Sequence, residues 1–87
     1  MVLKIKFFGK TKELEPTGSI TLNFDKNISV GELRTALIEK LSATSDQIKV
    51  ATLINDCALG NTQQVLRNEH LLCASQSLVL LPPVCGG

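Results

Sequence analysis

The chain has 87 residues, of which 44% are hydrophobic and 20% charged, and its formal net charge is +1. This length leaves room for one domain with a small core, and the composition is typical of a globular protein. The near balance of charges gives no basic field for a nucleic acid, and three phenylalanines without Trp or Tyr give few stacking platforms. The sequence thus argues against nucleic-acid binding and against a deep, self-contained active site.

The three cysteines are Cys57, Cys73 and Cys85. An odd count without a Cys-x-x-Cys pair predicts free thiols in a reducing compartment, and we expect Cys57 and Cys73 to be small buried residues. Lys4 and Lys6 interrupt the first apolar run, so a secretory leader is not expected. The longest apolar run, 78–85, has eight residues, too few for a membrane span. We expect a cytoplasmic protein without a membrane partner.

The first two predicted strands are 2–8 and 20–24. Leu3, Ile5 and Phe7 alternate with polar positions, which predicts a strand with one buried face. Phe8 then falls on the polar, lysine-bearing face. The polar segment 9–18 between the strands predicts a hairpin connection, so we expect the two strands to pair antiparallel.

A helix is predicted to begin at Ser29. The sequence Ser29-Val30-Gly31-Glu32 matches a capping box, in which the serine hydroxyl and the glutamate carboxylate each accept a backbone N–H. An apolar stripe at helical spacing follows and should end the helix near 41–42; it consists of Val30, Leu33, Leu37 and Leu41. Arg34 interrupts this stripe, so we expect it to reach an edge of the core.

The second half of the chain predicts a loop (43–47), a strand (48–54), a turn (Asn55-Asp56), a short return strand (57–59), an irregular segment (60–70) and a last strand (77–81). Val65 and Leu66 are expected to fill the core, and Pro82 should end regular pairing. One amphipathic helix needs one sheet face to cover. The predicted fold is therefore α+β: a β-grasp, or ubiquitin-like, roll over residues 1–81, followed by an extended tail, 82–87.

Side chains offer little conventional chemistry. The only histidine, His70, lies in a polar segment and is expected to be a surface or capping residue. No Cys/His cluster has the spacing of a metal site, and no Gly-rich loop precedes the helix, so we expect neither a metal nor a bound nucleotide.

The C-terminal end is unusual because a hydrophobic strand runs through Pro82 and Pro83 and then ends on Gly86 and Gly87. Prolines stiffen the exit from the sheet, and residues without Cβ make a thin thread. The last four residues can span roughly 13 Å at about 3.3 Å each. Such a tail can enter a narrow channel of another protein, and the reactive group would be the α-carboxylate of Gly87.

The chain resembles MoaD-type small subunits of molybdopterin synthase, which are ubiquitin-like sulfur carriers. The resemblance rests on Phe7-Phe8 with Lys12-Glu13-Leu14, on Val30-Gly31-Glu32-Leu33, on Ile54-Asn55 and on Pro82-Pro83-Val84-Cys85-Gly86-Gly87. It implies that Pro82, Pro83 and Gly86 thread the tail into partners, and that the first and last strands are neighbours in the sheet.

The resemblance also implies a reaction cycle. A MoeB-type adenylyltransferase, similar to ubiquitin-activating enzymes, joins Gly87 to AMP from ATP, and a persulfide donor converts this transient adenylate to a thiocarboxylate. The large, MoaE-type subunit then transfers the sulfur to cyclic pyranopterin monophosphate in molybdenum cofactor biosynthesis. This chain would be the non-catalytic subunit of a heterotetramer, with ATP consumed by the activating enzyme and no cofactor bound stably.

Phe8, Val79 and Leu81 are the predicted partner-binding residues, because strand alternation places them on the sheet face away from the helix. An exposed apolar patch on a small domain indicates an interface, although the loop 9–18 could instead cover it. Three other functions remain open: a sulfur carrier for thiamine thiazole synthesis, a protein modifier joined through Gly87 to lysines, and a domain that only binds partners. The Pro-Pro before the tail favours the molybdopterin carrier over the thiazole carrier. The departures from the family pattern are Ala74-Ser75-Gln76-Ser77 before the last strand and Leu80-Leu81 before the prolines.

Overall fold

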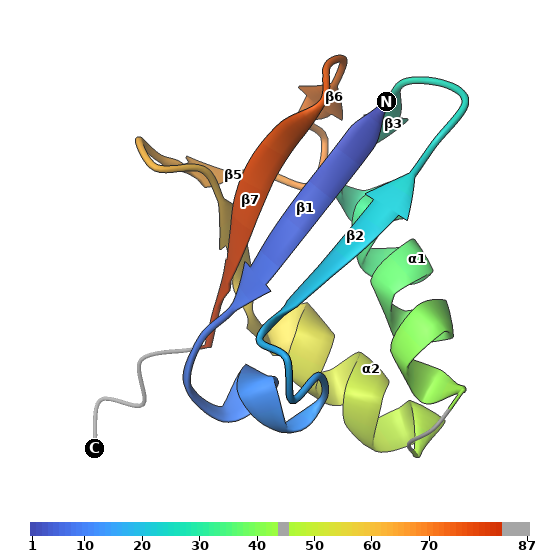
Figure 1. Ribbon diagram of the computed structural model, residues 1–87, viewed down its shortest axis with the longest axis vertical. Helices are drawn as coiled ribbons and strands as arrows, with labels where there is room; N and C mark the ends of the chain where they lie inside the picture. The colour runs from blue at the N-terminus through green and yellow to red at the C-terminus, as the bar shows by residue number, and fades with distance from the viewer. Residues whose placement is uncertain (44–45, 83–87) are drawn as a thin grey trace.

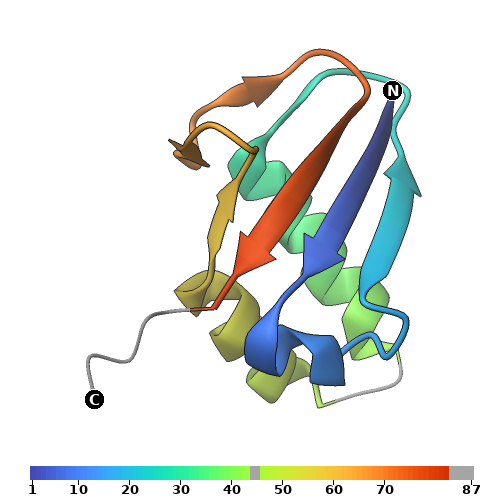
Figure 2. The same cartoon turned by 60° about the vertical axis from the view of Figure 1, so that its left-hand side comes forward.

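The computed structural model of the chain describes residues 1–43 and 46–82. In chain order these form β1 (Val2–Phe7), the 3-10 helix η1 (Gly9–Glu13), β2 (Ser19–Asn23), β3 (Ile28–Ser29), α1 (Val30–Ser42), α2 (Gln47–Asp56), β4 (Ala58–Gly60), β5 (Val65–Leu66), β6 (Leu71–Leu72) and β7 (Gln76–Leu81). Figure 1 shows the main sheet in front of the two α-helices, and Figure 2 shows from a second side that both helices lie on the same face of that sheet.

The main sheet has five strands in the order β2-β1-β7-β4-β5. The predicted antiparallel pairing of the first two strands is confirmed, with Ile5 opposite Ile20. The predicted neighbouring of the first and last strands is also confirmed, since β1 and β7 pair in parallel. A parallel pair requires a long crossover connection, which here contains both helices and therefore covers one face of the sheet.

The start of α1 follows the sequence prediction. The Glu32 amide donates to the Ser29 hydroxyl over 3.1 Å, and the Ser29 amide donates to the Glu32 carboxylate over 3.0 Å. The bond from the Ser29 amide holds the pKa of the Glu32 carboxyl below its ordinary value, helped by the nearby Lys26 charge. The whole predicted apolar stripe of α1 is buried, so the helix packs on the sheet as expected.

The prediction of a strand over 48–54 is wrong, because these residues form most of α2. The Asp46 carboxylate accepts the Ile48 and Lys49 amides and caps the helix. Val50 and Ile54, one helical turn apart, are fully buried where α2 packs against α1. Burial in that helix pair outweighs the preference of β-branched residues for strands.

Other expectations for the second half also change. The predicted turn at Asn55-Asp56 is the last part of α2, and the return strand is shifted to Ala58–Gly60. Leu66 fills the core as expected, but Val65 is 63% exposed, and Cys73 is exposed while Cys57 is buried. The small second sheet, β3 with β6, pairs Ile28 with Leu72 and closes the core at the start of α1.

The inner face of the sheet and the helices share one hydrophobic core. Its central side chains come from every layer, and those with no more than 1% exposure include Leu3, Ile5, Phe7, Leu33, Leu37, Ile54, Leu59, Leu72, Leu78 and Leu80. The arrangement is the predicted β-grasp roll, with a second helix that the sequence pattern did not indicate.

Candidate docking surface at the C-terminal exit

The outer face of the sheet carries the three residues predicted to bind a partner. Phe8 is 42% exposed, Leu81 is 38% exposed and Val79 is half-buried. The parallel register sets Lys6 beside Val79 and Phe7 beside Leu80, so Phe8 follows β1 at the level where Leu81 ends β7. The structure thus brings these residues to one end of one face; their role in binding stays a prediction.

Two further strands extend this apolar area. Ala58 of β4 pairs with Leu81, and Gly60 of β4 lies between Val79 and Val65. Phe8, Ala58, Val65, Val79 and Leu81 are hereafter called the outer patch. The sequence did not assign Ala58 and Val65 to it, because the pairing of β4 with β7 joins residues far apart in the chain.

Gly60 keeps the middle of the outer patch free of a side chain. A Cβ at this position would lie 2.6 Å from the carbonyl oxygen of Gln64 on the facing arm of the β4–β5 hairpin. A Cβ does not fit so close to a backbone oxygen. Only glycine at position 60 therefore allows the two arms of the hairpin to approach this closely. The backbone of Gln64 and Val65 therefore covers Gly60 between Val79 and Val65.

Phe8 is held at its position by a buried threonine. The Thr11 hydroxyl accepts the Phe8 amide over 3.0 Å and donates to the Phe8 carbonyl, and Thr11 is fully buried. A buried hydroxyl needs such partners, and here both come from the residue whose ring is exposed. Sequence reasoning missed Thr11, whose position in a polar loop gave no signal of burial.

The described part of the chain ends at Pro82, directly after Leu81 of this patch. The last strand ends at Leu81, as Pro82 predicted, and Pro82 is half-buried. Gly9 has a positive φ of 61°, and a Cβ on it would lie 3.0 Å from Cγ of Pro82. Gly9 thus lets the chain that leaves β1 pass close to the chain that leaves β7. The other predicted tail residues, Pro83, Gly86 and Gly87, and also Cys85, lie outside the described residues.

Arg34 holds the elements that lead into β4. Its Nη1 donates to the carbonyl oxygens of Ile54 and Cys57 over 2.7 Å each, and its Nε donates to Oδ1 of Asn68 over 2.8 Å. Partial burial lowers the pKa of Arg34 and raises the pKa of the Cys57 thiol. Arg34 does not simply reach the solvent edge: it caps the C-terminal end of α2, directly before β4.

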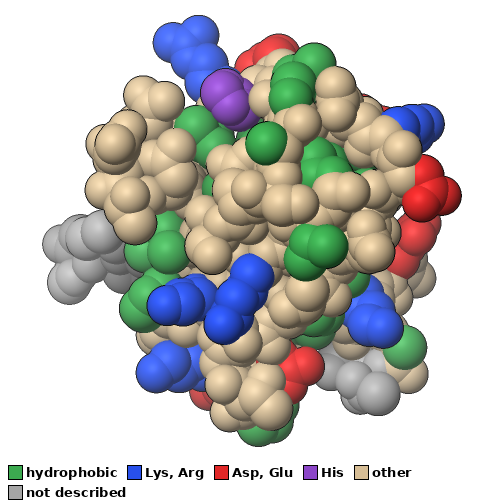
Figure 3. Space-filling model, turned by 45° about the horizontal axis from the view of Figure 1, so that its top comes forward, with side chains coloured by type: hydrophobic (Ala, Val, Ile, Leu, Met, Phe, Trp, Pro, Cys, Tyr) green, Lys and Arg blue, Asp and Glu red, His purple; other side chains and the backbone are tan. Residues whose placement is uncertain are grey.

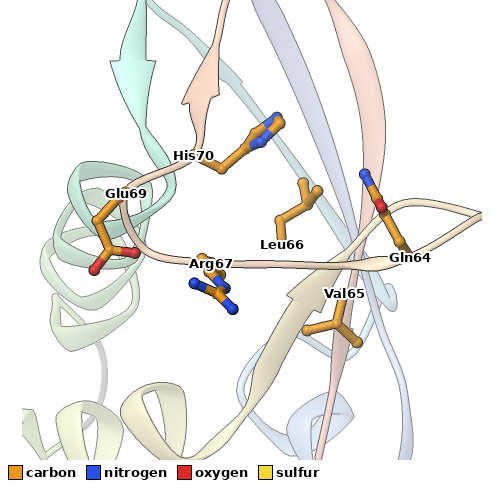
Figure 4. A pocket seen from close by; sticks show the side chains of 6 residues that line it. All are labelled: Gln64, Val65, Leu66, Arg67, Glu69 and His70. Carbon is orange, nitrogen blue, oxygen red and sulfur yellow. The ribbon is translucent and has the colours of Figure 1, made fainter.

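His70 lies in the loop between β5 and β6, beside a pocket that shares Val65 with the outer patch. It lines this pocket, of about 570 Å³, together with Gln64, Val65, Leu66, Arg67 and Glu69. Figure 4 shows the His70, Arg67 and Glu69 side chains pointing in different directions, so they do not converge on one point. Among the described residues, no three His, Cys, Asp or Glu side chains are grouped as metal ligands.

Solved structures of similar fold exist. Small archaeal modifier protein 1 from Haloferax volcanii is similar in one structure with a TM-score of 0.75 and 20% identity over all of both chains. A second structure of that protein has a TM-score of 0.68 and 16% identity, over 95% of this chain and 98% of the other. A protein assigned as molybdopterin converting factor, subunit 1, from Pyrococcus furiosus has a TM-score of 0.68 and 16% identity, over 97% and 99%. These likenesses confirm the β-grasp fold.

The sequence itself carries a family match. None of the curated proteins is significantly similar in sequence. No helix in the described ranges is long and apolar enough to cross a membrane. In contrast to the curated proteins, the ThiS family profile does match the chain. It covers residues 5–87 and so extends through the Gly-Gly end. The chain therefore belongs to the ThiS family of ubiquitin-like sulfur carriers and modifiers.

Proposed function

We propose that this chain is the sulfur-carrier subunit of a molybdopterin synthase, and that Gly87 is its reaction centre. The observation that carries the proposal is the family match through residue 87, on a domain whose last strand delivers the tail beside an apolar patch. The Pro82-Pro83 step before the tail supports the molybdopterin branch over the thiazole branch of the family.

The chemistry requires activation of the tail. A carboxylate is a poor electrophile because oxide is a poor leaving group, so an activating enzyme first transfers AMP from ATP to the Gly87 carboxylate and releases pyrophosphate. A persulfide sulfur attacks the acyl-adenylate, AMP leaves, and reductive cleavage of the resulting acyl disulfide by a thiol gives the thiocarboxylate. Nothing in this sequence of steps uses a side chain of the carrier, in agreement with the scattered groups around His70.

The proposed partner subunit supplies the catalytic residues. We expect the tail to enter the large subunit until the thiocarboxylate reaches cyclic pyranopterin monophosphate, with Pro82 and Pro83 directing the thread and Gly86 keeping it thin. The outer patch would then cover the rim of the entrance. Burying apolar residues such as Phe8 and Leu81 at the centre of an interface is what makes them energetically dominant.

Reconstitution tests this function. The chain is charged to the thiocarboxylate form and mixed with the large subunit from the same organism and cyclic pyranopterin monophosphate, and dithiolene formation is measured. The proposal predicts product with the thiocarboxylate form of the chain and none with the carboxylate form. A charged chain that binds the large subunit but yields no product would contradict the molybdopterin role.

The protein-modifier function is the second candidate, because the fold is shared with small archaeal modifier protein 1. It uses the same adenylate but ends with Gly87 joined to lysine amines of other proteins. An antibody against the chain would then detect a ladder of larger species in cell extract, and these would disappear when Gly87 is deleted. A pure sulfur carrier gives a single band.

A further inference from the structure

The main sheet ends in two edge strands of different length. Over residues 1–43 and 46–82, β5 forms one edge with two residues, and β2 forms the other with five. Figure 2 shows β2 along one border of the sheet, next to β1. An edge strand presents unpaired N–H and C=O groups, to which a strand of another chain can add. The longer edge, β2, is therefore the one at which the sheet can be extended.

The pairing of β2 with β1 determines which of its backbone groups point outward. Phe24 and Met1 exchange backbone hydrogen bonds of 2.8 and 2.9 Å. Because hydrogen-bonded and non-hydrogen-bonded pairs alternate along an antiparallel ladder, Ile20 and Leu22 also direct their backbone groups toward β1. The alternate residues direct theirs to the open edge; these are Ser19, Thr21 and Asn23.

β2 lacks the sequence features that normally protect such an edge. Charged side chains, prolines and bulges on an edge strand discourage the addition of a second strand. β2 contains no charged residue and no proline, and its register against β1 runs without a break from Ser19 to Asn23. The Ser19 carbonyl accepts the Thr17 hydroxyl over 3.0 Å, but its second lone pair can accept another donor. The edge is thus open to a strand that fits it.

A second copy of β2 fits this edge. When two antiparallel copies place Thr21 opposite Thr21, all five residues are paired, and the outward groups of Ser19 meet those of Asn23. Threonine pairs across antiparallel strands are favourable. On the inner face Ile20 then lies opposite Leu22, which is only half-buried in the single chain. The order of polar and apolar residues is the same from both ends of β2, as a twofold interface requires.

The charges of the chain allow two copies to approach one another. The formal net charge is only +1, so mutual repulsion is small. Figure 3 shows both basic and acidic side chains along the right-hand margin of the face that it displays, on the side where β2 lies in Figure 1. Lys4 is beside Thr21 in the sheet but is one strand removed from the edge. Within β2 itself no charge faces the second copy.

We infer that this chain forms a twofold dimer through antiparallel pairing of β2 with β2, which makes one continuous sheet with the two β2 strands in its middle. A five-residue edge buries little area, so the dimer is weak and dissociates in the micromolar to millimolar range. β7, which leads to the tail, is separated from β2 by β1. The interface therefore leaves Leu81 of the outer patch uncovered, and the inference does not rest on the reaction proposed for Gly87.

The test introduces charges at the twofold axis. Thr21 is exposed and faces its own counterpart in the dimer, so Thr21→Lys or Thr21→Glu places two like charges opposite one another. A mixture of these two variants places opposite charges there instead. The controls Ser77→Lys and Ser77→Glu make the same charge changes in β7, on the same face and at the same level of the sheet. Sedimentation equilibrium measures association, and circular dichroism verifies that each variant is folded.

We expect each Thr21 variant alone to have a dimer dissociation constant at least about tenfold higher than that of the wild type. The mixture should recover most of the lost affinity, and both Ser77 variants should associate like the wild type. A wild type that stays monomeric at millimolar concentration would overturn the inference and leave the edge to an extended segment of another protein. The inference also fails if the Thr21 variants dimerise like the wild type, or if their mixture associates no better than either alone. Conversion of Gly87 to the thiocarboxylate, measured separately, tests the proposed function independently.

Discussion

The two faces of the main sheet are built from the same strands and have opposite properties. Leu80 and Leu81 are consecutive in β7, yet Leu80 is fully buried and Leu81 is 38% exposed. The inner face packs against α1 and α2 and determines the fold. In the described part of the chain both α-helices lie on the other face, which leaves the outer face available to a partner. Substitutions on the two faces should therefore separate stability from binding.

A change in the tail should separate stability from function most completely. Deleting Gly87 moves the terminal carboxyl back by about 3.3 Å, the length of one residue, and replaces the group that is adenylated. We expect sulfur transfer to be abolished and the melting temperature to be unchanged, because residue 87 follows the last strand of the domain. Molybdopterin formation by the truncated chain would refute the role of Gly87.

The inner face is tested by Leu80→Ala. Removal of a fully buried leucine should lower the free energy of unfolding by about 2–5 kcal/mol, as measured by urea denaturation. The neighbouring Leu81→Ala should change it by less than about 0.5 kcal/mol. Similar losses for both substitutions would contradict the division between the two faces.

The outer face is tested by Leu81→Asp and by Phe8→Asp. Each should weaken binding to the large subunit by about 2 kcal/mol or more, the scale of a residue at the centre of an interface. Asn23→Asp adds the same charge to the same face at its far end and should bind almost normally. Calorimetric titration gives the three affinities, and undiminished binding by both patch variants would show that the partner docks elsewhere.

The exit of the tail allows a finer comparison between two glycines. Gly9 and Gly18 both have a positive φ, but only Gly9 faces Pro82 closely, since nothing lies within 4 Å of a Cβ at Gly18. Gly9→Ala and Gly18→Ala should each cost about 1–2 kcal/mol of backbone strain, seen in thermal unfolding. Only Gly9→Ala should also slow the conversion of Gly87 to the thiocarboxylate.

Pro82→Ala provides the matching control for that substitution. It removes Cγ, the atom closest to the Gly9 position, and leaves Cβ at 3.9 Å, an ordinary contact distance. Combining it with Gly9→Ala should restore part of the charging rate without restoring the melting temperature. If Gly87 is converted to the thiocarboxylate at the same rate in the two glycine variants, the contact with Pro82 has no role in directing the tail.

The smallest effect concerns the helix cap and depends on pH. The folded pKa of Glu32 lies below its ordinary value of 4.5, chiefly through the Ser29 amide. This stabilisation is present above the unfolded pKa and is lost as the pH falls through the folded pKa. Thermal unfolding of the wild type should therefore be more sensitive to acid than that of Glu32→Gln. Parallel curves would show that the cap is not charge-dependent.

Local signals in the sequence were sufficient to predict those elements whose structure depends on residues close together in the chain. The Ser29–Glu32 cap and the alternation of β1 depend on residues within one turn or one strand, and both are confirmed. The segment 48–54 fits both periods, because its β-branched residues alternate while Val50 and Ile54 are four apart. Packing against α1, which no local pattern contains, decides for the helix.

The outer patch was only half predictable for the same reason. Alternation along β1 and β7 placed Phe8, Val79 and Leu81 on one face, and the resemblance to MoaD-type carriers implied that the two strands are neighbours. Ala58 and Val65 joined them through the pairing of β4 with β7 and β5, which depends on where α2 ends. The buried Thr11 and the approach of Gly9 to Pro82 are also tertiary, so composition and spacing could not have indicated them.

The central claim is that the reactive group is the terminal carboxyl of the main chain, and the intact mass of the protein isolated from its own cells tests it most directly. The account predicts a fraction heavier by the difference between a sulfur and an oxygen atom, located by fragmentation at Gly87. A protein found only with an ordinary carboxylate, even in cells that are making molybdopterin, would contradict it.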